Sequence, residues 1–210
     1  MILKPKAFIF DMDGVIIDTE RTKYRSLQII LKKYGIKLNK DPKLLGMSSK
    51  DLFIRLKKDY NLDYDVNDLV KSREELIFSL FSKEKIRIMP GFLRLIKSLR
   101  KNRIKIGLAT SSTKKFLNFV MNKVKIKKCF DVMICGDDVK HSKPNPMIYI
   151  LAAKKLRVKP KDCIVVEDAV NGIKAAKSAG MYVIGITNTF QRRYLNDTDI
   201  IVKSLDEIRL

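Results

Sequence analysis

The sequence predicts an α/β fold, in which a doubly wound, mainly parallel Rossmann-like sheet carries an inserted all-helical domain. Two observations support this prediction. Short apolar segments alternate with amphipathic helical patterns in the second half of the chain, and a long helical stretch separates the first apolar segment from the others. Alternating strands and helices are typical of parallel sheets that helices cover on both faces.

The predicted strands are short runs that are apolar almost throughout. Runs of this length and composition are typical of parallel strands that are buried on both faces. In chain order the runs are KAFIF (6–10), IKIGLAT (104–110), FDVMIC (130–135), DCIVVE (162–167) and MYVIGI (181–186).

Helices are predicted between the later strands, because apolar residues recur there at helical spacing. The predicted ranges are 113–123, 144–156 and 169–179. Gly180 follows the last range, and glycine at this position is a typical signal for the end of a helix.

The first predicted strand is followed by roughly 75 residues before the next strand-and-helix unit, which is too long for an ordinary crossover. Residues 20–34 and 66–81 in this interval carry apolar side chains at helical spacing. We therefore expect residues 16–87 to form an inserted helical cap domain. Residues 1–15 and 88–210 are expected to form the α/β core domain.

The 210-residue chain is 46% hydrophobic, which suffices for one substantial core or for a core domain with a smaller companion. Its cysteines, Cys129, Cys135 and Cys163, are odd in number, widely spaced and set among apolar residues. This pattern favours reduced core thiols, so we expect a cytoplasmic protein. No apolar run is long enough for a signal peptide or a membrane span, so no membrane partner is expected. No heptad or large apolar stripe is evident, which favours a monomer.

The formal net charge of +21 reflects 44 Lys and Arg residues against 23 Asp and Glu residues. The excess is mostly lysine scattered along the predicted helices, and aromatic residues do not interleave with it. This pattern favours a solvated surface over a nucleic-acid-binding face, although a positive field would still attract small anionic substrates. A non-enzymatic basic module that binds RNA or protein is kept as an alternative.

Polar clusters follow four of the predicted strands. Because the carboxyl ends of parallel strands meet at one rim of a sheet, we expect these clusters to converge on one site. Taken singly, each cluster could equally be a solvated loop or a helix cap. The clusters are Asp11 and Asp13, Thr110-Ser111-Ser112, Ser142-Lys143-Pro144 and Glu167-Asp168.

The segments DMDGVIIDT, LATSS, SKPNP and VVEDAVNGIKAA, in this order and spacing, resemble the four motifs of the haloacid dehalogenase superfamily. With its helical insert after the first motif, the whole chain resembles the β-phosphoglucomutase-like branch of that superfamily. Four motifs that each follow a predicted strand are far more specific than any one of them alone.

The resemblance implies phosphoryl transfer through an aspartyl-phosphate. Asp11 would be the nucleophile that attacks phosphorus, and Asp13 would protonate the leaving alcohol and then activate water. An anion that attacks a phosphate dianion is repelled, so the site needs positive charge. A Mg²⁺ ion would supply it, held by Asp11, by the backbone carbonyl of Asp13, and by Asp168 with Glu167 adjacent.

The two remaining motifs would hold the phosphate. Lys143 would add a fixed positive charge beside the nucleophile, and Pro144 would start the following helix. Thr110 and the backbone amide of Ser111 would hold phosphoryl oxygens.

Two further polar residues lie near the motifs. Thr19 could either contact the site or cap the helix that follows it. His141, the only histidine, is expected to be an exposed loop residue rather than a catalyst.

The resemblance leaves the phosphoryl acceptor open between water, in a phosphatase, and a second sugar hydroxyl, in a mutase. True β-phosphoglucomutases have a cap histidine where local matching places Lys23. They also have an arginine after Gly-x-Ser, where this chain has Ser49. Lys50 could replace that arginine as a phosphate grip, and Arg73 lies about where the mutases have a cap lysine.

We expect these four cap residues to contact the substrate. The departures from the mutase pattern favour a magnesium-dependent phosphatase for a small phosphorylated metabolite, such as a sugar phosphate. A β-phosphoglucomutase-type mutase is the alternative.

Overall fold

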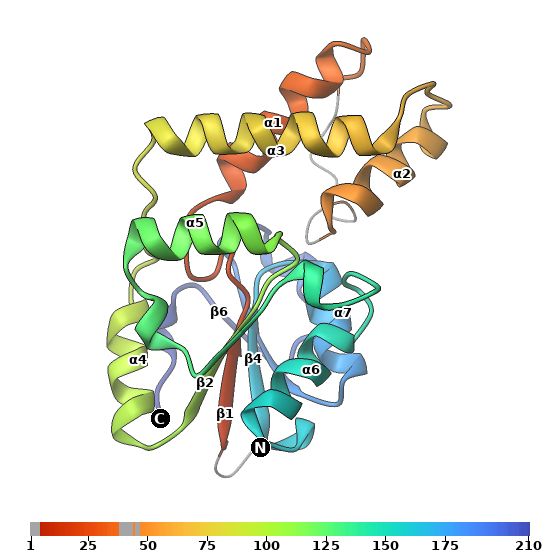
Figure 1. The fold of residues 1–210 in the computed structure, drawn as a ribbon. Coiled ribbons are helices and arrows are strands. Elements are labelled where there is room, and N and C mark those ends of the chain that lie inside the picture. The colour runs from red at the N-terminus through yellow and green to blue at the C-terminus, as the bar shows by residue number, and fades with distance from the viewer. Residues whose placement is uncertain (1–4, 38–43, 45–46) are drawn as a thin grey trace.

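The structure is a computed structural model that describes residues 5–37, 44 and 47–210. A six-stranded sheet forms its centre (Figure 1), with the strand order β3-β2-β1-β4-β5-β6 and parallel pairing throughout. The prediction of a doubly wound parallel sheet is confirmed, and the order reverses between β1 and β4. The strands are β1 (Ala7–Phe10), β2 (Lys105–Ala109), β3 (Val132–Ile134), β4 (Cys163–Glu167), β5 (Tyr182–Ile186) and β6 (Ile200–Val202).

Helices cover both faces of the sheet (Figure 1). Because side chains alternate along a strand, β1 contributes to two separate cores. Phe8 and Phe10 pack with α4 and α5 on one face, whereas Ala7 and Ile9 pack with α6 and α7 on the other. These helices are α4 (Phe92–Lys101), α5 (Lys114–Val124), α6 (Met147–Leu156) and α7 (Val170–Ser178).

The predicted helix at 144–156 begins later than expected. Its first residue is Met147, preceded by Pro146, so the prediction that Pro144 starts the helix is wrong. The side chain of Asn145 instead accepts a hydrogen bond from the Met147 amide at 3.0 Å, which satisfies one of the amides that a helix start leaves without a partner.

None of the described helices has the length and apolar character that crossing a membrane requires. Short 3₁₀ turns connect several of the elements of the fold. The turns are Lys127–Cys129, Gly136–Asp138, Pro160–Asp162, Arg192–Tyr194 and Leu205–Glu207.

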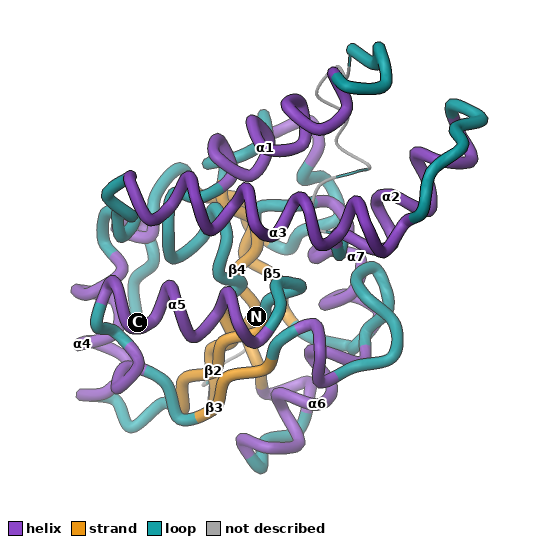
Figure 2. The backbone as a smooth tube through the Cα atoms, turned by 45° about the horizontal axis from the view of Figure 1, so that its top comes forward, coloured by secondary structure: helices purple, strands orange, loops and turns teal. Residues whose placement is uncertain are grey.

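Three helices lie over the carboxyl-terminal edge of the sheet (Figures 1 and 2): α1 (Glu20–Lys32), α2 (Ser49–Asp59) and α3 (Val66–Lys83). They share a hydrophobic cluster of their own, which includes Leu31, Phe53 and Leu69. The end of α3 differs, because Ile77 and Phe81 pack into the core cluster that contains Phe10. The separate cluster indicates a helical cap, but Ile16, Ile17 and Ile86 also belong to the core cluster of the sheet, and the bounds 16–87 stay a prediction.

Candidate active site

Asp11 and Asp13 leave the end of β1 as predicted, and both are buried, with 7% and 8% of their surfaces exposed. The backbone amide of Asp11 donates to the carbonyl of Val166, so the ladder with β4 continues to this residue. Gly14 follows with φ +82°, and a Cβ at this position would lie 1.9 Å from Oδ2 of Asp168. Glycine therefore lets the first loop pass directly against the fourth motif.

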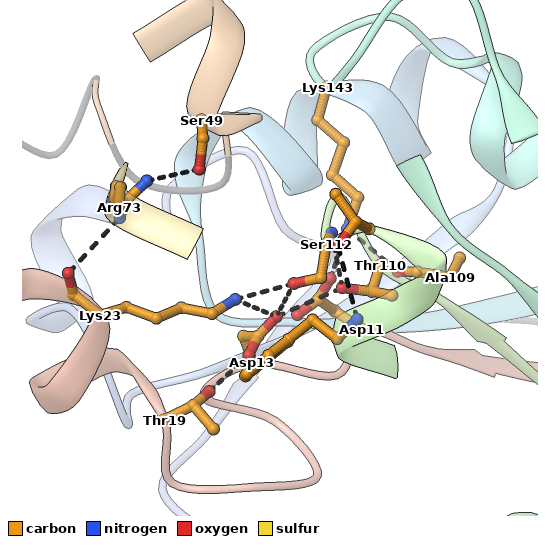
Figure 3. A network of polar contacts seen from close by, with 12 residues as sticks. Asp11, Asp13, Thr19, Lys23, Ser49, Arg73, Ala109, Thr110, Ser112 and Lys143 are labelled. Atoms are coloured by element: carbon orange, nitrogen blue, oxygen red, sulfur yellow. Dashed lines mark hydrogen bonds and ion pairs between the residues drawn. The ribbon is translucent and has the colours of Figure 1, made fainter. Parts of the chain in front are cut away.

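Lys143 joins three parts of the site, and Figure 3 shows it reaching down from the loop before α6. Its Nζ donates to Oδ1 of Asp11 at 2.6 Å, to Oε1 of Glu167 at 2.7 Å and to the carbonyl of Ala109 at 3.2 Å. Burial alone would lower the pKa of Lys143, but Asp11 and Glu167 hold it well above its usual range. The lysine is therefore a permanent cation beside the predicted nucleophile.

Glu167 is fixed by four donors. Besides Lys143, it accepts hydrogen bonds from the hydroxyl of Tyr149 and from the backbone amides of Asp168 and Ala169, each at 2.9 Å. Gly172 in α7 leaves the room for this carboxylate, since a Cβ there would lie 1.6 Å from Oε1 of Glu167. Glu167 thereby positions Lys143 and the start of α7.

Three buried carboxylates from two motifs could hold a metal ion. Oxygen atoms of Asp11, Glu167 and Asp168 lie within 4.8 Å of one another. Burial raises the pKa of Asp11 to about 8, although Lys143 opposes the rise. Burial and the neighbouring Glu167 raise the pKa of Asp168 well above its usual range, although the hydroxyl of Thr189 donates to it. Crowded acidic oxygens of this kind suit Mg²⁺, whose charge would offset their repulsion.

Among these residues, Asp11 and Asp168 are the better placed ligands because Glu167 already accepts four hydrogen bonds. The side chain of Asp13 lies outside this group of carboxylates, as far as the described residues show. Its predicted contact with the metal was through the backbone carbonyl, and that contact stays a prediction.

The carboxylate of Asp13 faces the cap (Figure 3). Lys23 from α1 lies with its Nζ 2.5 Å from Oδ2 of Asp13, and the hydroxyls of Ser112 and Thr110 donate to the same oxygen at 2.8 and 3.2 Å. Thr19 donates to Oδ1 at 2.5 Å and makes no side-chain cap bond for α1, so it contacts the site. Although burial would raise the pKa of Asp13, Lys23 and the hydroxyl groups of Thr19 and Ser112 lower it. Asp13 is therefore ionised in this arrangement.

The second motif forms the loop between β2 and α5. Thr110 is fully buried, and its hydroxyl accepts a hydrogen bond from the Ser112 amide at 3.1 Å. Thr113 caps α5 by accepting from the Phe116 amide. Ser111 lines the cavity described next, where its predicted contact with a phosphoryl group would take place.

A cavity of about 100 Å³ lies between the cap and the sheet. Lys23, Ser49 and Arg73 line it from the cap, so three of the four predicted cap residues meet the motifs there. Lys50 is exposed and lines a neighbouring cavity of about 320 Å³, which Lys23, Ser49 and Ser111 also border. The core residues that line the first cavity include Asp11, Asp13, Ser111, Ser112, Glu167 and Asp168.

Three further contacts of the site were not predicted from the sequence, and one residue, His141, lies where it was expected. Ser142 of the third motif donates to the carboxylate of Asp51 in α2, which connects the core with the cap. Tyr149 holds Glu167 but carries no signal beyond an aromatic residue on an apolar helix face. His141 is exposed, as predicted. Thr189 could have been found by the rule used for the other motifs, because it follows β5 at the same rim.

Comparisons with known proteins agree with this geometry. The model of a protein family described as haloacid dehalogenase-like hydrolase matches residues 8–186. A phosphorylated carbohydrates phosphatase from Thermotoga maritima is 33% identical over 178 residues, which cover 84% of this chain and 82% of the relative. A β-phosphoglucomutase from Bacillus subtilis is 31% identical over 216 residues, which cover 98% of this chain and 92% of the relative.

A solved structure gives the same result. The β-phosphoglucomutase from Clostridium difficile has a TM-score of 0.88 and 30% identity to this chain, and the match covers 98% of this chain and 93% of that one. The prediction of a phosphatase-type enzyme is thereby confirmed at the level of the family. The chain belongs to the haloacid dehalogenase-like hydrolases, within their β-phosphoglucomutase-like branch.

Proposed function

We propose that this hydrolase is a magnesium-dependent phosphatase that acts on a small phosphorylated metabolite, such as a sugar phosphate, through a phosphoryl group on Asp11. The observation that carries the proposal is the arrangement around Lys143, whose Nζ lies between the carboxylates of Asp11 and Glu167 in a buried site. This cation lowers the repulsion that an anionic nucleophile meets at a phosphate group.

Asp11 and Asp13 take different roles because they have different neighbours. Asp11 faces Lys143 and the carboxylates of the proposed metal site, so it is placed to attack phosphorus. Bound Mg²⁺ would supply positive charge to the phosphoryl oxygens. Asp13 lies on the cap side, where it can donate a proton to the leaving alcohol and later take one from water.

The contact with Lys23 decides which of these two proton transfers Asp13 is ready for. With Lys23 against it, Asp13 is ionised and suited to remove a proton from water in the second step. The first step needs a protonated Asp13, and Lys23 must release Asp13 for this to occur. An anionic substrate in the cavity offers Lys23 another partner, which makes this release possible.

A mutase that returns the phosphoryl group to a sugar is the second candidate, and the similarity to two β-phosphoglucomutases favours it. Lys23 contacts Asp13 where true mutases have a histidine, and Ser49 replaces their arginine, so the phosphatase is preferred. Incubation with a hexose 1-phosphate and a trace of the bisphosphate separates the two. A mutase forms the 6-phosphate, whereas a phosphatase releases inorganic phosphate.

The direct test of the proposal is hydrolysis of an aryl phosphate with and without Mg²⁺, with Asp11→Asn as the control. We expect release of phosphate that depends on Mg²⁺ and is lost in the variant. Activity that survives Asp11→Asn would contradict the assigned nucleophile. A phosphate-release screen over phosphorylated sugars, acids and nucleotides would then define the substrate.

The non-enzymatic alternative predicts binding to RNA that weakens steeply with salt. The buried set of Asp11, Asp13, Lys143 and Asp168 argues against it, because solvent-facing binding modules have no need of such a cluster. Absence of salt-dependent binding in a filter assay would dismiss this alternative.

A further inference from the structure

Basic side chains gather at the amino-terminal edge of the sheet, which lies opposite the cap and the candidate active site (Figure 1). Two cavities of about 380 and 370 Å³ lie there, and Arg157 borders both, so we call their joint surface the basic edge. All its basic side chains are exposed. They are Arg100, Arg103, Lys105, Lys155 and Arg157 in the first cavity, and Lys6, Arg157, Lys159 and Lys161 in the second.

The two carboxylates that line the basic edge do not neutralise it. Asp131 accepts from Arg100 and from the Ile106 amide, each at 2.7 Å, and Asp162 lies 3.3 Å from Lys6. The other basic side chains of the edge therefore keep their charge exposed to solvent. Those that form no ion pair within the described residues are Arg103, Lys105, Lys155, Arg157, Lys159 and Lys161.

Two of these arginines occupy backbone positions that ordinarily favour glycine. Arg103 follows α4 with φ 55°, and Arg157 ends α6 with φ 56°. This left-handed conformation costs a residue with a Cβ more than a cation gains from the end of a helix, and the last turns of both helices already have basic residues. Stability alone would favour glycine at both positions. Arginine there indicates that charge at this edge has a function.

The composition of the basic edge indicates a phosphate backbone as its partner. Arginine presents paired N–H donors that fit phosphate oxygens. In the described part of the chain no aromatic residue lines either cavity, so single-stranded bases would find no side chain on which to stack. Apolar lining residues such as Ile104 and Leu156 are buried, whereas a membrane or a typical protein partner needs an exposed apolar anchor.

We propose that the basic edge binds the phosphate backbone of a double-helical nucleic acid, independently of base sequence. The candidate active site lies at the other end of the strands, roughly 15 Å away at about 3.3 Å per residue, so it stays open when the basic edge is occupied. The lysines scattered along the helices are still expected to form a solvated surface. The basic edge differs from them because the fold brings together residue 6, residues 100–105 and residues 155–161.

The test compares two variants of equal net charge. Fluorescence anisotropy measures the binding of a labelled 20-base-pair RNA duplex at about 0.1 M KCl, where charges more than about 10 Å away are largely screened. The edge variant combines Arg103→Gln, Lys155→Gln, Arg157→Gln and Lys159→Gln. The control variant removes the same charge from exposed positions of the cap, through Lys32→Gln, Lys33→Gln, Lys58→Gln and Lys71→Gln.

We expect the wild type to bind the duplex and the edge variant to bind it roughly a hundredfold more weakly. The slope of log Kd against log salt concentration should fall by about three to four in the edge variant, because each lost phosphate contact removes about 0.9. The control variant should stay within about fivefold of the wild type. Hydrolysis of an aryl phosphate should be unchanged in both variants, since neither touches the candidate active site.

A second variant separates binding from folding. Arg103→Gly combined with Arg157→Gly should melt no lower than the wild type, because glycine suits both left-handed positions. It should nevertheless bind the duplex roughly tenfold more weakly or worse, since two phosphate contacts are lost.

Four results would overturn the proposal. One is the absence of duplex binding by the wild type. Another is equal weakening in the edge and control variants, which would show that binding follows net charge alone. The third is tighter binding of a single-stranded RNA of the same length. The fourth is binding to anionic lipid vesicles that depends on the edge residues when duplex binding does not.

Discussion

Gly172→Ala tests how the site is held together. Gly172 lies within α7, where alanine would ordinarily be favoured by about 1 kcal/mol. Here the added Cβ would lie 1.6 Å from Oε1 and 2.0 Å from the carboxyl carbon of Glu167. Either Glu167 or α7 must move. We predict that the substitution destabilises the protein, in contrast to its usual effect in a helix.

The magnitude follows from the contacts of Glu167. This carboxylate accepts hydrogen bonds from Lys143, Tyr149 and two backbone amides, and Lys143 is only 1% exposed. Removing one partner of a buried ion pair costs about 3–5 kcal/mol. After the helix-propensity gain, the free energy of unfolding should fall by about 2–4 kcal/mol. Phosphate release should fall as well, because Lys143 loses part of its support beside Asp11.

Urea unfolding followed by circular dichroism measures this change in four proteins: wild type, Gly172→Ala, Glu167→Ala and the double variant. Without the Glu167 side chain there is no carboxylate to displace. Gly172→Ala should then be neutral or stabilising by up to about 1 kcal/mol in the Glu167→Ala background. The same destabilisation in both backgrounds would refute the reasoning.

The remaining predictions concern the metal, the cap and the thiols. Chelation of divalent cations should abolish phosphate release and lower the melting temperature, because Asp11 and Asp168 lose the metal ion whose charge offsets their repulsion. An unchanged rate after full chelation would contradict the metal site. Lys23→Met should raise the pKa of Asp13, whose ionised form Lys23 now favours. Because the first step needs a protonated Asp13, the basic limb of the kcat/KM profile should move to higher pH, and an unmoved limb would show that Lys23 does not act on Asp13 during turnover. Burial raises the pKa of Cys135 to about 11 and of Cys163 to about 12, so both should react slowly with a disulfide reagent at pH 8, whereas urea-unfolded protein should react at all three cysteines at once. Cys129 is only partly buried, so rapid reaction of more than one thiol per native chain would contradict the burial of Cys135 and Cys163. Because these folded-state values exceed the usual 9.0, the thiols should cost stability only as the pH rises above 9, where they ionise in the unfolded chain first.

The sequence was most informative where structure follows from local periodicity and from the geometry of parallel sheets. Strands β1 to β5 could be predicted from apolar runs alone. That four motifs meet at one rim could be predicted because the carboxyl ends of parallel strands lie at the same edge of a sheet. Strand β6 was not predicted, because its apolar run, Ile200–Val202, is only three residues long and stands between Asp199 and Lys203. A run this short carries no periodicity to detect. Strand β3 is equally short, but its apolar run extends beyond the strand, in FDVMIC.

The helices show the same limit. Helix α2 was not predicted, although Ser48 caps it by accepting from the Asp51 amide and Leu52, Phe53 and Leu56 are buried at helical spacing. Leu52, Phe53 and Ile54 form an unbroken apolar run although Ile54 is exposed, which hides the helical spacing. A search for capping residues would have found this helix.

Contacts between distant elements were the least predictable. That Lys23 lies against Asp13, and that Arg73 is held at Ser49, depends on how α1, α2 and α3 pack over the sheet. No local pattern encodes that packing. The resemblance to a family indicated which cap residues to consider, but the partner of each came from the structure. The monomeric state and the cytoplasmic location stay predictions.

The central claim is that Asp11 receives the phosphoryl group, and trapping this species tests it most directly. The protein would be mixed with a ³²P-labelled substrate found in the phosphate-release screen, quenched in acid within milliseconds, digested and mapped by mass spectrometry. We predict label on the peptide that contains Asp11, lost on treatment with hydroxylamine as for an acyl phosphate, and no label in Asp11→Asn. Turnover with no covalent label at any quench time, or with label on another residue, would contradict the account.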